Sequence, residues 1–266
     1  ADTFIGSCGK MTSLSGLKAV LFDLDDTLWD LCVTMQHAHA AWRDEVSRYP
    51  GGVKLAEACS DWTLWTDASS AFQEVKKECP AIAKDLPQVR REAMRRACAA
   101  RDLDAEALVE PGFAAWTAKR NVPVFFDGSL SLLRRLRAKG ILVGAISDGF
   151  ADLTQIPELQ GLLDFAIFAR DVGVSKPDPK IFEQAVKEVS QRLPNGDTCQ
   201  PNECLMVGDS YSKDVLGATA IGMRAIWFDN PSSFPRSLCG QSAPTAADAC
   251  ETKIASIGEL QSWLNL

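Results

Sequence analysis

The feature that most restricts the fold is a series of short apolar segments separated by residues with helical periodicity. Each segment is four to six residues long, which is typical of a buried strand. The helix predicted directly before the segment 141–146 has Leu130, Leu133 and Leu136 on one face and ends at Gly140. The five segments are residues 18–22, 141–146, 165–168, 204–207 and 224–228. Strands that alternate with helices predict an α/β fold, with a mostly parallel sheet covered by helices on both faces.

A long region of different character separates the first two segments. From about Trp29 to Pro123 the chain is rich in Ala, Glu, Lys and Arg at helical spacing, and the region has the size of a small domain. Breaks between its helices are predicted where Pro or Gly occur, at residues 49–52, 79–80 and 111–112. We therefore expect a sheet-containing domain formed by residues 1–28 and 124–266, and a helical domain formed by residues 29–123.

Two stretches stand outside this pattern. Residues 230–250 are rich in Ser, Pro and Ala and predict an irregular segment, and residues 1–10 are left out of the fold prediction. Ser256 with Glu259 forms a possible capping box, which indicates a terminal helix that ends near Leu264.

Charge and cysteine content exclude several classes of protein. With 28 Lys and Arg against 35 Asp and Glu, the net charge is −7, which disfavours binding to nucleic acid or to anionic membranes. No apolar run approaches the length of a membrane helix, and the first ten residues lack the apolar region of a signal peptide. The nine cysteines are an odd number, which favours a reducing compartment. We expect a soluble intracellular protein of the cytoplasm or an organelle interior, either a monomer or a homodimer.

Polar and acidic residues gather directly after the predicted strands. In open α/β sheets, ligands bind beyond the carboxyl ends of the strands, so these residues are the functional candidates. Several carboxylates at one edge of a sheet repel one another when desolvated and require a cation. Oxygen ligands favour Mg²⁺, held by Asp23, Asp209 and a backbone carbonyl near Asp25, with Asp214 as a further candidate. The candidates are Asp23, Asp25, Ser147, Asp148, Lys176, Asp209 and Asp214.

The spacing of Asp23 and Asp25 has a chemical meaning. Residues two apart in an extended segment lie on the same side, so Asp23 can attack a phosphorus atom while Asp25 reaches the leaving oxygen. The attack forms an aspartyl phosphate, and Asp25 then acts as the base for the water that hydrolyses it. Ser147 and Lys176 are expected to hold the phosphoryl oxygens, together with the backbone N–H groups of Leu24 and Asp25.

Four stretches of the chain resemble the motifs of the haloacid dehalogenase (HAD) superfamily, and they occur in the family's order. They are Phe-Asp23-Leu-Asp25-Asp-Thr27-Leu, Ile-Ser147-Asp-Gly, Lys176-Pro-Asp-Pro and Gly-Asp209-Ser-Tyr-Ser-Lys-Asp214. The resemblance covers residues 18–228 apart from the helical region. It implies a Rossmann-like sheet, dependence on Mg²⁺ and phosphoryl transfer through Asp23. It also implies that the helical region is a mobile cap that closes over the substrate, as in phosphoglycolate phosphatase-like members.

Details of the motifs separate the chemistries of that family. Its dehalogenases lack the second Asp of the first motif, so Asp25 favours a phosphatase. Its sugar-phosphate mutases usually have Gly-Val or a similar pair where this chain has Asp26 and Thr27, which favours hydrolysis. Asp148 stands where Asn is common, so it either points away from phosphate or contacts a hydroxyl or amine of the substrate.

The predicted function is therefore Mg²⁺-dependent hydrolysis of a small phosphorylated metabolite. A 2-haloacid dehalogenase, a phosphosugar mutase and a non-catalytic phosphate-binding protein are the alternatives. Phosphoglycolate, a sugar phosphate and a nucleotide or flavin phosphate all remain open as substrates.

Four arginines in the helical region form a basic band at helical spacing: Arg90, Arg91, Arg95 and Arg96. Such a band is usually a solvated helix face, and we expect that here. The alternative is that one of these arginines reaches a second anionic group of the substrate.

Four further residues that could mark a site are expected to be structural. Asp26 and Asp178 are expected to cap a turn or a helix. His37 and His39 are two residues apart, so on a helix they do not face each other and are not expected to share a metal.

Overall fold

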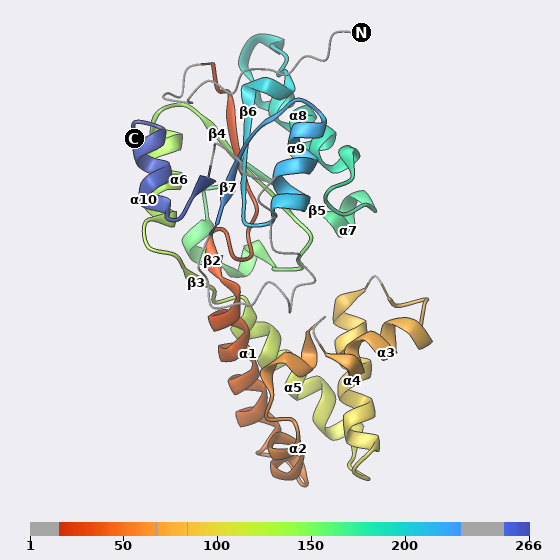
Figure 1. Cartoon of the computed structure of the whole chain (residues 1–266). Coiled ribbons are helices and arrows are strands. Elements are labelled where there is room, and N and C mark those ends of the chain that lie inside the picture. Colours follow the sequence, from red (N-terminus) through yellow and green to blue (C-terminus); the bar gives the residue numbers. More distant parts are fainter. Residues whose placement is uncertain (1–15, 67–68, 84, 230–252) are drawn as a thin grey trace.

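The computed structural model describes residues 16–66, 69–83, 85–229 and 253–266. Its centre is a six-stranded parallel sheet with the strand order β5-β4-β1-β6-β7-β8 (Figure 1). The strands are β1 (Ala19–Phe22), β4 (Leu142–Ser147), β5 (Phe165–Phe168), β6 (Cys204–Gly208), β7 (Arg224–Phe228) and β8 (Lys253–Ile254). The first five confirm the predicted strands to within one residue at each end, and the parallel α/β fold is confirmed with them.

Helices cover both faces of the sheet, because alternate strand residues point to opposite faces. Val20 and Phe22 of β1 belong to the apolar core on one face, while Ala19 and Leu21 belong to the core on the other. The first face is covered by α6 (Ser129–Ala138) and α10 (Ile257–Trp263), and the second by α8 (Pro179–Arg192) and α9 (Leu216–Ala220) (Figure 1). The short helix α7 (Ala169–Val172) follows β5.

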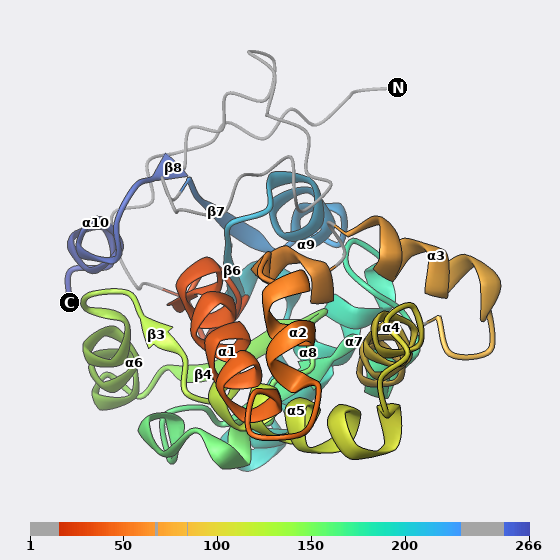
Figure 2. The same ribbon diagram turned by 90° about the horizontal axis from the view of Figure 1, so that it is seen from below.

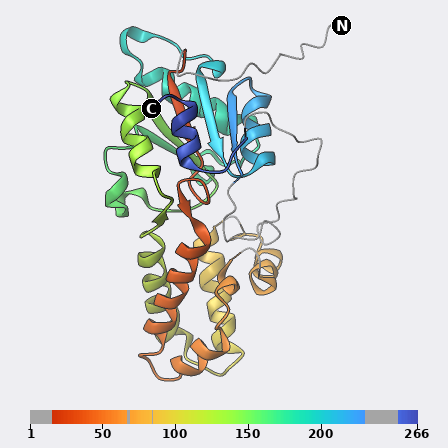
Figure 3. The ribbon, with the colours of Figure 1, turned by 60° about the vertical axis from the view of Figure 1, so that its left-hand side comes forward.

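Five of the helices described between β1 and β4 form a separate layer, here called the helical module (residues 31–120). Figure 3 shows it beyond the end of the sheet at which β1 finishes, and in Figure 2, seen from below, its helices lie in front of the sheet. Its own core includes Trp42, Trp65 and Trp116, all buried. The helices are α1 (Leu31–Val46), α2 (Gly52–Ala58), α3 (Ser70–Glu78), α4 (Leu86–Ala99) and α5 (Ala105–Arg120).

The chain enters and leaves the helical module at neighbouring points. Strand β2 (Trp29–Asp30) leads into α1, and β3 (Val124–Phe125) follows α5. The two strands pair antiparallel, with Trp29 opposite Phe125. The last residues of α5 are therefore held close to the end of β1.

One predicted helix break is wrong. Helix α5 runs through residues 111 and 112 without interruption, although Pro111 lacks an N–H and costs an interior helix about 3 kcal/mol. Packing explains the difference, because a Cβ at Gly112 would lie 2.7 Å from Val46 Cγ1 and 2.8 Å from the Trp42 ring. Gly112 thus permits a close approach of α5 to α1, and the apolar burial that results offsets the local cost. The predicted breaks at 49–52 and 79–80 are confirmed.

The predicted end signals of two helices are also confirmed. Gly140 follows α6 with a φ of 75°. Ser256 caps α10 by accepting from Glu259 N at 3.2 Å, but the Glu259 carboxylate accepts from Ala255 N at 2.8 Å, so the reciprocal bond of a capping box goes to the preceding residue. Residues 1–10 and 230–250 lie outside the described residues. Within the described ranges, none of the helices has the length and apolar character needed to cross a membrane.

Candidate active site

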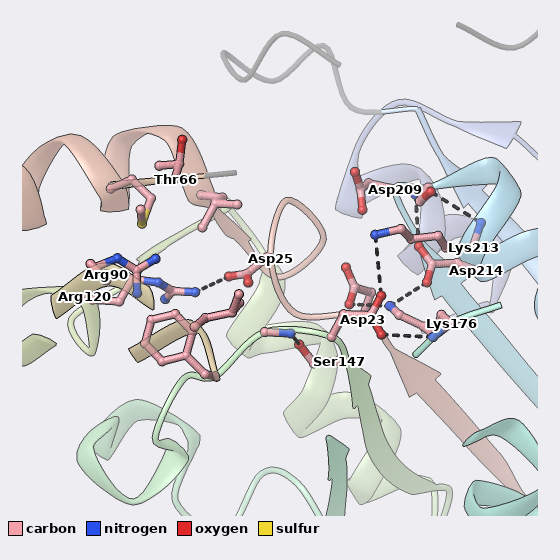
Figure 4. A pocket seen from close by; sticks show the side chains of 17 residues that line it. Asp23, Asp25, Thr66, Arg90, Arg120, Ser147, Lys176, Asp209, Lys213 and Asp214 are labelled. Atoms are coloured by element: carbon pink, nitrogen blue, oxygen red, sulfur yellow. Dashed lines mark hydrogen bonds and ion pairs between the residues drawn. The ribbon is translucent and has the colours of Figure 1, made fainter. Parts of the chain in front are cut away.

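A cavity of about 230 Å³ lies where the helical module meets the carboxyl ends of the central strands (Figure 4). Its lining includes seven of the eight predicted site residues: Asp23, Asp25, Ser147, Asp148, Lys176, Asp209 and Asp214. The helical module contributes Leu31, Met35, Thr66, Leu86, Arg90 and Arg120. Both parts of the chain therefore form the wall of one cavity.

Strand order explains why residues so distant in sequence meet here. Strand β1 lies between β4 and β6, so Asp23 after β1 has Ser147 at the end of β4 on one side and Asp209 after β6 on the other. Asp214 lies in a single π-helical turn, Tyr211–Val215, that follows β6. A Cβ at Gly208 would lie 2.3 Å from the Asp214 carboxylate, so this glycine allows the turn to fold back onto the strand end.

Three carboxylates form the most acidic part of the cavity. Oxygens of Asp23, Asp209 and Asp214 lie within 4.8 Å of one another. Lys176 Nζ donates to Asp23 Oδ1 and to Asp214 Oδ1, each at 2.6 Å (Figure 4). The backbone of Asp209 is held by a bond from its N–H to Thr27 Oγ1 at 3.0 Å. Such a set of clustered oxygen donors is suited to a hard divalent cation.

Burial and charge act against each other in this cluster. Burial raises the pKa of Asp23 well above its usual range, although the Lys176 ammonium acts to lower it. Burial by itself would lower the pKa of Lys176. The Asp214 and Asp23 carboxylates have the larger combined effect, so the pKa of this lysine is raised. Lys176 is therefore protonated. When all three carboxylates are ionised, the one ammonium leaves two negative charges, which one divalent ion would balance.

Asp25 has different neighbours from Asp23. Its Oδ1 accepts from Trp29 Nε1 at 2.7 Å and from Arg120 Nη2 at 2.6 Å. Its Oδ2 lies beside Gly149, because a Cβ added at Gly149 would be only 2.7 Å from this oxygen. The carboxylate of Asp25 is not part of the three-carboxylate cluster among the described residues, so the two acids of the first motif occupy separate chemical environments.

Two neighbouring residues at the carboxyl end of β4 differ in the direction of their side chains. Ser147 is buried and its Oγ accepts from Gly149 N at 3.0 Å. Asp148 accepts from the backbone N–H of Lys176 at 3.0 Å and lies 3.5 Å from Lys213 Nζ. Both carboxylate oxygens of Asp148 are thus engaged by protein groups, and one of them fixes the segment that carries Lys176. Of the two alternatives for Asp148, orientation away from a bound phosphate agrees better with these contacts.

Three further sequence predictions have clear outcomes. Leu24 is fully buried and is not among the described residues that line the cavity, so a role for its backbone N–H stays a prediction. Asp26 accepts from Leu31 N at the start of α1, and Asp178 accepts from Lys180 N at the start of α8, both at 3.0 Å. Their expected role as capping residues is confirmed.

The basic band is solvated only in part. Arg91, Arg95 and Arg96 pair with glutamates at the surface. Arg90 is 3% exposed and lines the cavity, so the expectation of a common solvated face is wrong for this residue. The reason is helical geometry, because the side chain of Arg90 stands about 100° around the helix axis from that of Arg91 and points to the cavity.

Sequence reasoning did not find Arg120 as a residue of the site. A signal was present. A module inserted between two neighbouring strands enters and leaves at adjacent points, so residues near its exit, such as Arg120, must lie beside the first motif. Lys213, which faces Asp148, had no comparable signal.

Comparison with known proteins settles the family. Residues 17–222 match the model of the haloacid dehalogenase-like hydrolases. The chain belongs to this hydrolase family. The match includes the helical module and all four motifs, so the predicted HAD resemblance and the Rossmann-like fold are confirmed.

Relatives of this HAD chain include both phosphatases and dehalogenases. It is 28% identical over 225 residues to a glyceraldehyde 3-phosphate phosphatase from Pyrococcus furiosus, covering 80% of each protein. It is also 28% identical to a phosphoserine phosphatase from Thermus thermophilus, covering 80% of this chain and 89% of that protein. Among solved structures, a 2-haloacid dehalogenase from Pseudomonas syringae pv. Tomato superposes with a TM-score of 0.69 at 27% identity, covering 93% of this chain and 97% of the other.

Proposed function

We propose that this HAD hydrolase is a Mg²⁺-dependent phosphatase that hydrolyses a small phosphomonoester through an aspartyl phosphate on Asp23. The observation that carries the proposal is the separation of two carboxylates in one cavity. Asp23 contacts Lys176 within the acidic cluster, whereas Asp25 contacts Trp29 and Arg120 outside it. Two carboxylates in different environments can take different roles, one as nucleophile and one as acid and base.

The relatives support the same reaction class. Curated relatives named for phosphatase activity, such as those on glyceraldehyde 3-phosphate and phosphoserine, cover four fifths of this chain. The similarity to a 2-haloacid dehalogenase supports the fold, but proteins of one fold catalyse different reactions. The reaction must therefore be inferred from the residues of the cavity. Asp25 favours the phosphatase, because release of an alkoxide requires a proton donor at that position.

In the first step, a carboxylate oxygen of Asp23 attacks the phosphorus atom and the P–O bond to the substrate's alcohol breaks. The leaving oxygen takes the proton of the Asp25 carboxyl group. Lys176 and the Ser147 hydroxyl are placed in the cavity wall to bind phosphoryl oxygens, where fixed donors stabilise the charge that develops in the transition state.

In the second step, Asp25 takes a proton from water as the water oxygen attacks the phosphorus of the aspartyl phosphate. The bond between phosphorus and the Asp23 oxygen breaks, inorganic phosphate leaves and both carboxyl groups return to their starting state. Asp25 Oδ1 is held by Trp29 and Arg120, so Oδ2 is the oxygen available to carry the proton.

Asp23, Asp209 and Asp214 are the residues that would hold Mg²⁺, with the backbone carbonyl of Asp25 as a proposed fourth ligand. When bound, the ion would neutralise the excess negative charge and lower the repulsion between Asp23 and an approaching phosphate. The residues present fit this ion, since they supply clustered carboxylate oxygens with two unbalanced charges.

The helical module is proposed to act as a cap. It contributes an apolar wall and two arginines to the cavity, so its contact with the sheet domain excludes bulk water from the reacting groups. We place the functional boundary at residues 29 and 123, where β2 and β3 connect the two parts.

Release of phosphate from p-nitrophenyl phosphate and from a panel of phosphorylated metabolites tests the proposal. We expect activity that requires added Mg²⁺, is abolished by chelation and is lost in Asp23→Asn. Activity that survives both treatments would contradict the mechanism. Release of halide from 2-haloacids, or an isomerised sugar phosphate without free phosphate, would instead identify one of the alternative chemistries.

A further inference from the structure

We propose that Phe150 is a positioning residue for the reaction, because its ring docks the loop that begins at Ser147 onto the helical module. This loop is here called the β4 loop (residues 147–152). Closure of the module over the cavity and placement of the β4 loop beside Asp25 are then one event. The inference rests on the proposed phosphatase function and deepens it, since it names a contact through which the module acts on the reacting groups.

The β4 loop crosses the boundary between two apolar cores. Ala151 is 2% exposed and belongs to the core on one face of the sheet. The preceding residue, Phe150, packs instead against the core of the helical module. Among the described residues of that core and its partly buried neighbours, Phe150 alone comes from outside the module. The loop therefore has one side chain anchored in each part of the protein.

Two residues of the module form the surface that receives Phe150. Trp116 of α5 stacks on Phe150, with ring centres 6.0 Å apart and ring planes 17° apart. The guanidinium carbon of Arg90, in α4, lies 4.8 Å from the ring centre of Phe150 and 4.1 Å from that of Trp116. Arg90 Nε donates to the carbonyl of Trp65 at 2.8 Å, which holds the guanidinium within the module. A stacked ring and a cation–π contact together stabilise the docked position of Phe150.

The docked loop reaches the reacting groups through short contacts. Gly149, the neighbour of Phe150, donates its N–H to Ser147 Oγ at 3.0 Å. A Cβ at Gly149 would lie 2.7 Å from Asp25 Oδ2, so the loop backbone lies against the oxygen proposed to carry the proton. Loss of the docked ring should therefore displace the Ser147 hydroxyl and open space around Asp25.

A hydrogen bond at the other end of the loop supports the same coupling. The backbone N–H of Asp152 donates to Oδ1 of Asn121 at 3.2 Å, and Asn121 directly follows α5. Trp116 and Asn121 thus attach the loop to one helix and its C-terminal cap. Phe150 also lines the cavity, so the module, the loop and the space for the substrate meet at this ring.

The test makes the same substitution at two phenylalanines. Phe150→Leu keeps an apolar side chain but removes the ring that Trp116 and Arg90 contact. We expect kcat to fall about tenfold for both p-nitrophenyl phosphate and acetyl phosphate, the combined effect of a ring pair and a cation–π contact. Both leaving groups depart without a proton but differ in size, so an equal fall indicates displaced loop residues. A ring that only lined the cavity would instead affect KM for the larger ester.

Phe113→Leu is the matched control. Phe113 stacks on Trp116 with ring centres 6.3 Å apart and belongs to the same core, but it is not among the described residues that line the cavity. Its kcat should equal that of the wild type at a temperature well below the melting temperature of both variants. Phe150→Tyr retains the ring and should recover the wild-type kcat. Phe150→Met takes the place of Phe150→Leu if the latter does not fold.

Hydrogen exchange measures the position of the loop without turnover. In Phe150→Leu, the amide hydrogens of Gly149 and Asp152 should exchange about tenfold faster than in the wild type, whereas Phe113→Leu should leave them unchanged. The inference is overturned by a wild-type kcat in Phe150→Leu, by a change confined to KM for p-nitrophenyl phosphate, or by the same loss of kcat in Phe113→Leu. The phosphatase function would survive each of these results. Absence of phosphate release from every ester would overturn the proposed function, and the exchange rates would still decide whether Phe150 docks the loop.

Discussion

Arg120, the last residue of α5, donates a 2.6 Å hydrogen bond to Oδ1 of Asp25, a residue 95 positions earlier in the chain. The bond joins the helical module to the proposed acid and base of the reaction. Trp29 donates to the same oxygen, so both the entry and the exit of the module contribute to the orientation of Asp25. The position of the module and the geometry of the reaction are thereby linked.

Loss of this bond should affect the step in which Asp25 donates a proton. In Arg120→Gln we expect kcat for an alkyl phosphate whose alkyl group is uncharged to fall about tenfold to hundredfold, as for loss of a charge-assisted hydrogen bond. The fall for p-nitrophenyl phosphate should be smaller, because nitrophenolate leaves without protonation. Steady-state kinetics on both substrates measure the difference. Lys119→Gln removes the neighbouring charge as a control, and equal losses on both substrates would contradict a role through Asp25.

Binding of Mg²⁺ to the acidic cluster should stabilise the folded protein independently of turnover. We expect the melting temperature to rise with Mg²⁺ concentration, because a ligand that binds only the folded state stabilises it by mass action. Asp209→Asn should shift this dependence to higher Mg²⁺ concentration. Asp178→Asn, which alters a capping carboxylate at the start of α8, should retain the wild-type dependence. The proposed ligand set is wrong if Asp209→Asn and wild type respond alike in differential scanning fluorimetry.

Gly149 should be required for activity because of its nearness to two functional side chains. An added Cβ would lie 2.7 Å from Asp25 Oδ2 and 3.2 Å from Ser147 Oγ. Gly149→Ala should therefore lower kcat strongly while the melting temperature changes little, since the collision is with the ends of side chains. In the control Gly258→Ala, the new Cβ would come no closer than 3.7 Å to another group, and kcat should stay the same. A fully active Gly149→Ala enzyme would show that Asp25 does not need this position.

Histidine 39 should make the stability of the protein depend on pH. Burial lowers the pKa of His39 to about 4, below its ordinary value of 6.5. Between pH 6.5 and about pH 4, His39 is therefore protonated in the unfolded chain and neutral in the folded protein. The free energy of unfolding falls as the pH decreases through this range. The full contribution is about 3 kcal/mol.

Urea unfolding at pH 7.5 and pH 4.5 measures this effect. His39→Gln should lose less stability than wild type between the two pH values, whereas His37→Gln, in which an exposed histidine on the same helix is replaced, should behave as wild type. The same pH dependence in all three proteins would exclude His39 as the source.

Much of the fold and part of the site could be predicted because they depend on local patterns. The apolar segments identify the strands, and a parallel sheet brings the residues after those strands to one edge. Asp23, Ser147 and Asp209 could therefore be grouped without coordinates. The capping roles of Asp26 and Asp178 could be predicted as well, because capping involves only residues a few positions away.

Other features depend on contacts between distant segments. Whether Arg90 faces solvent or the cavity is decided by the packing of α4 against its neighbours, and the periodicity of α4 alone is compatible with both. The continuity of α5 through Pro111 depends on the fit of Gly112 against Trp42, which outweighs a local preference to break the helix. Asp148 is similar, because its orientation follows from contacts with Lys176 and Lys213.

By itself, the sequence determined the parallel α/β core and the acidic edge at which a phosphate ester and a cation can meet, because strand periodicity and strand ends are local properties. Tertiary structure alone decided which side chains close that edge from the opposite side. Arg90 and Arg120 belong to helices whose orientation is set by burial of apolar surface over the whole module, a sum over many distant contacts that no short stretch of sequence contains.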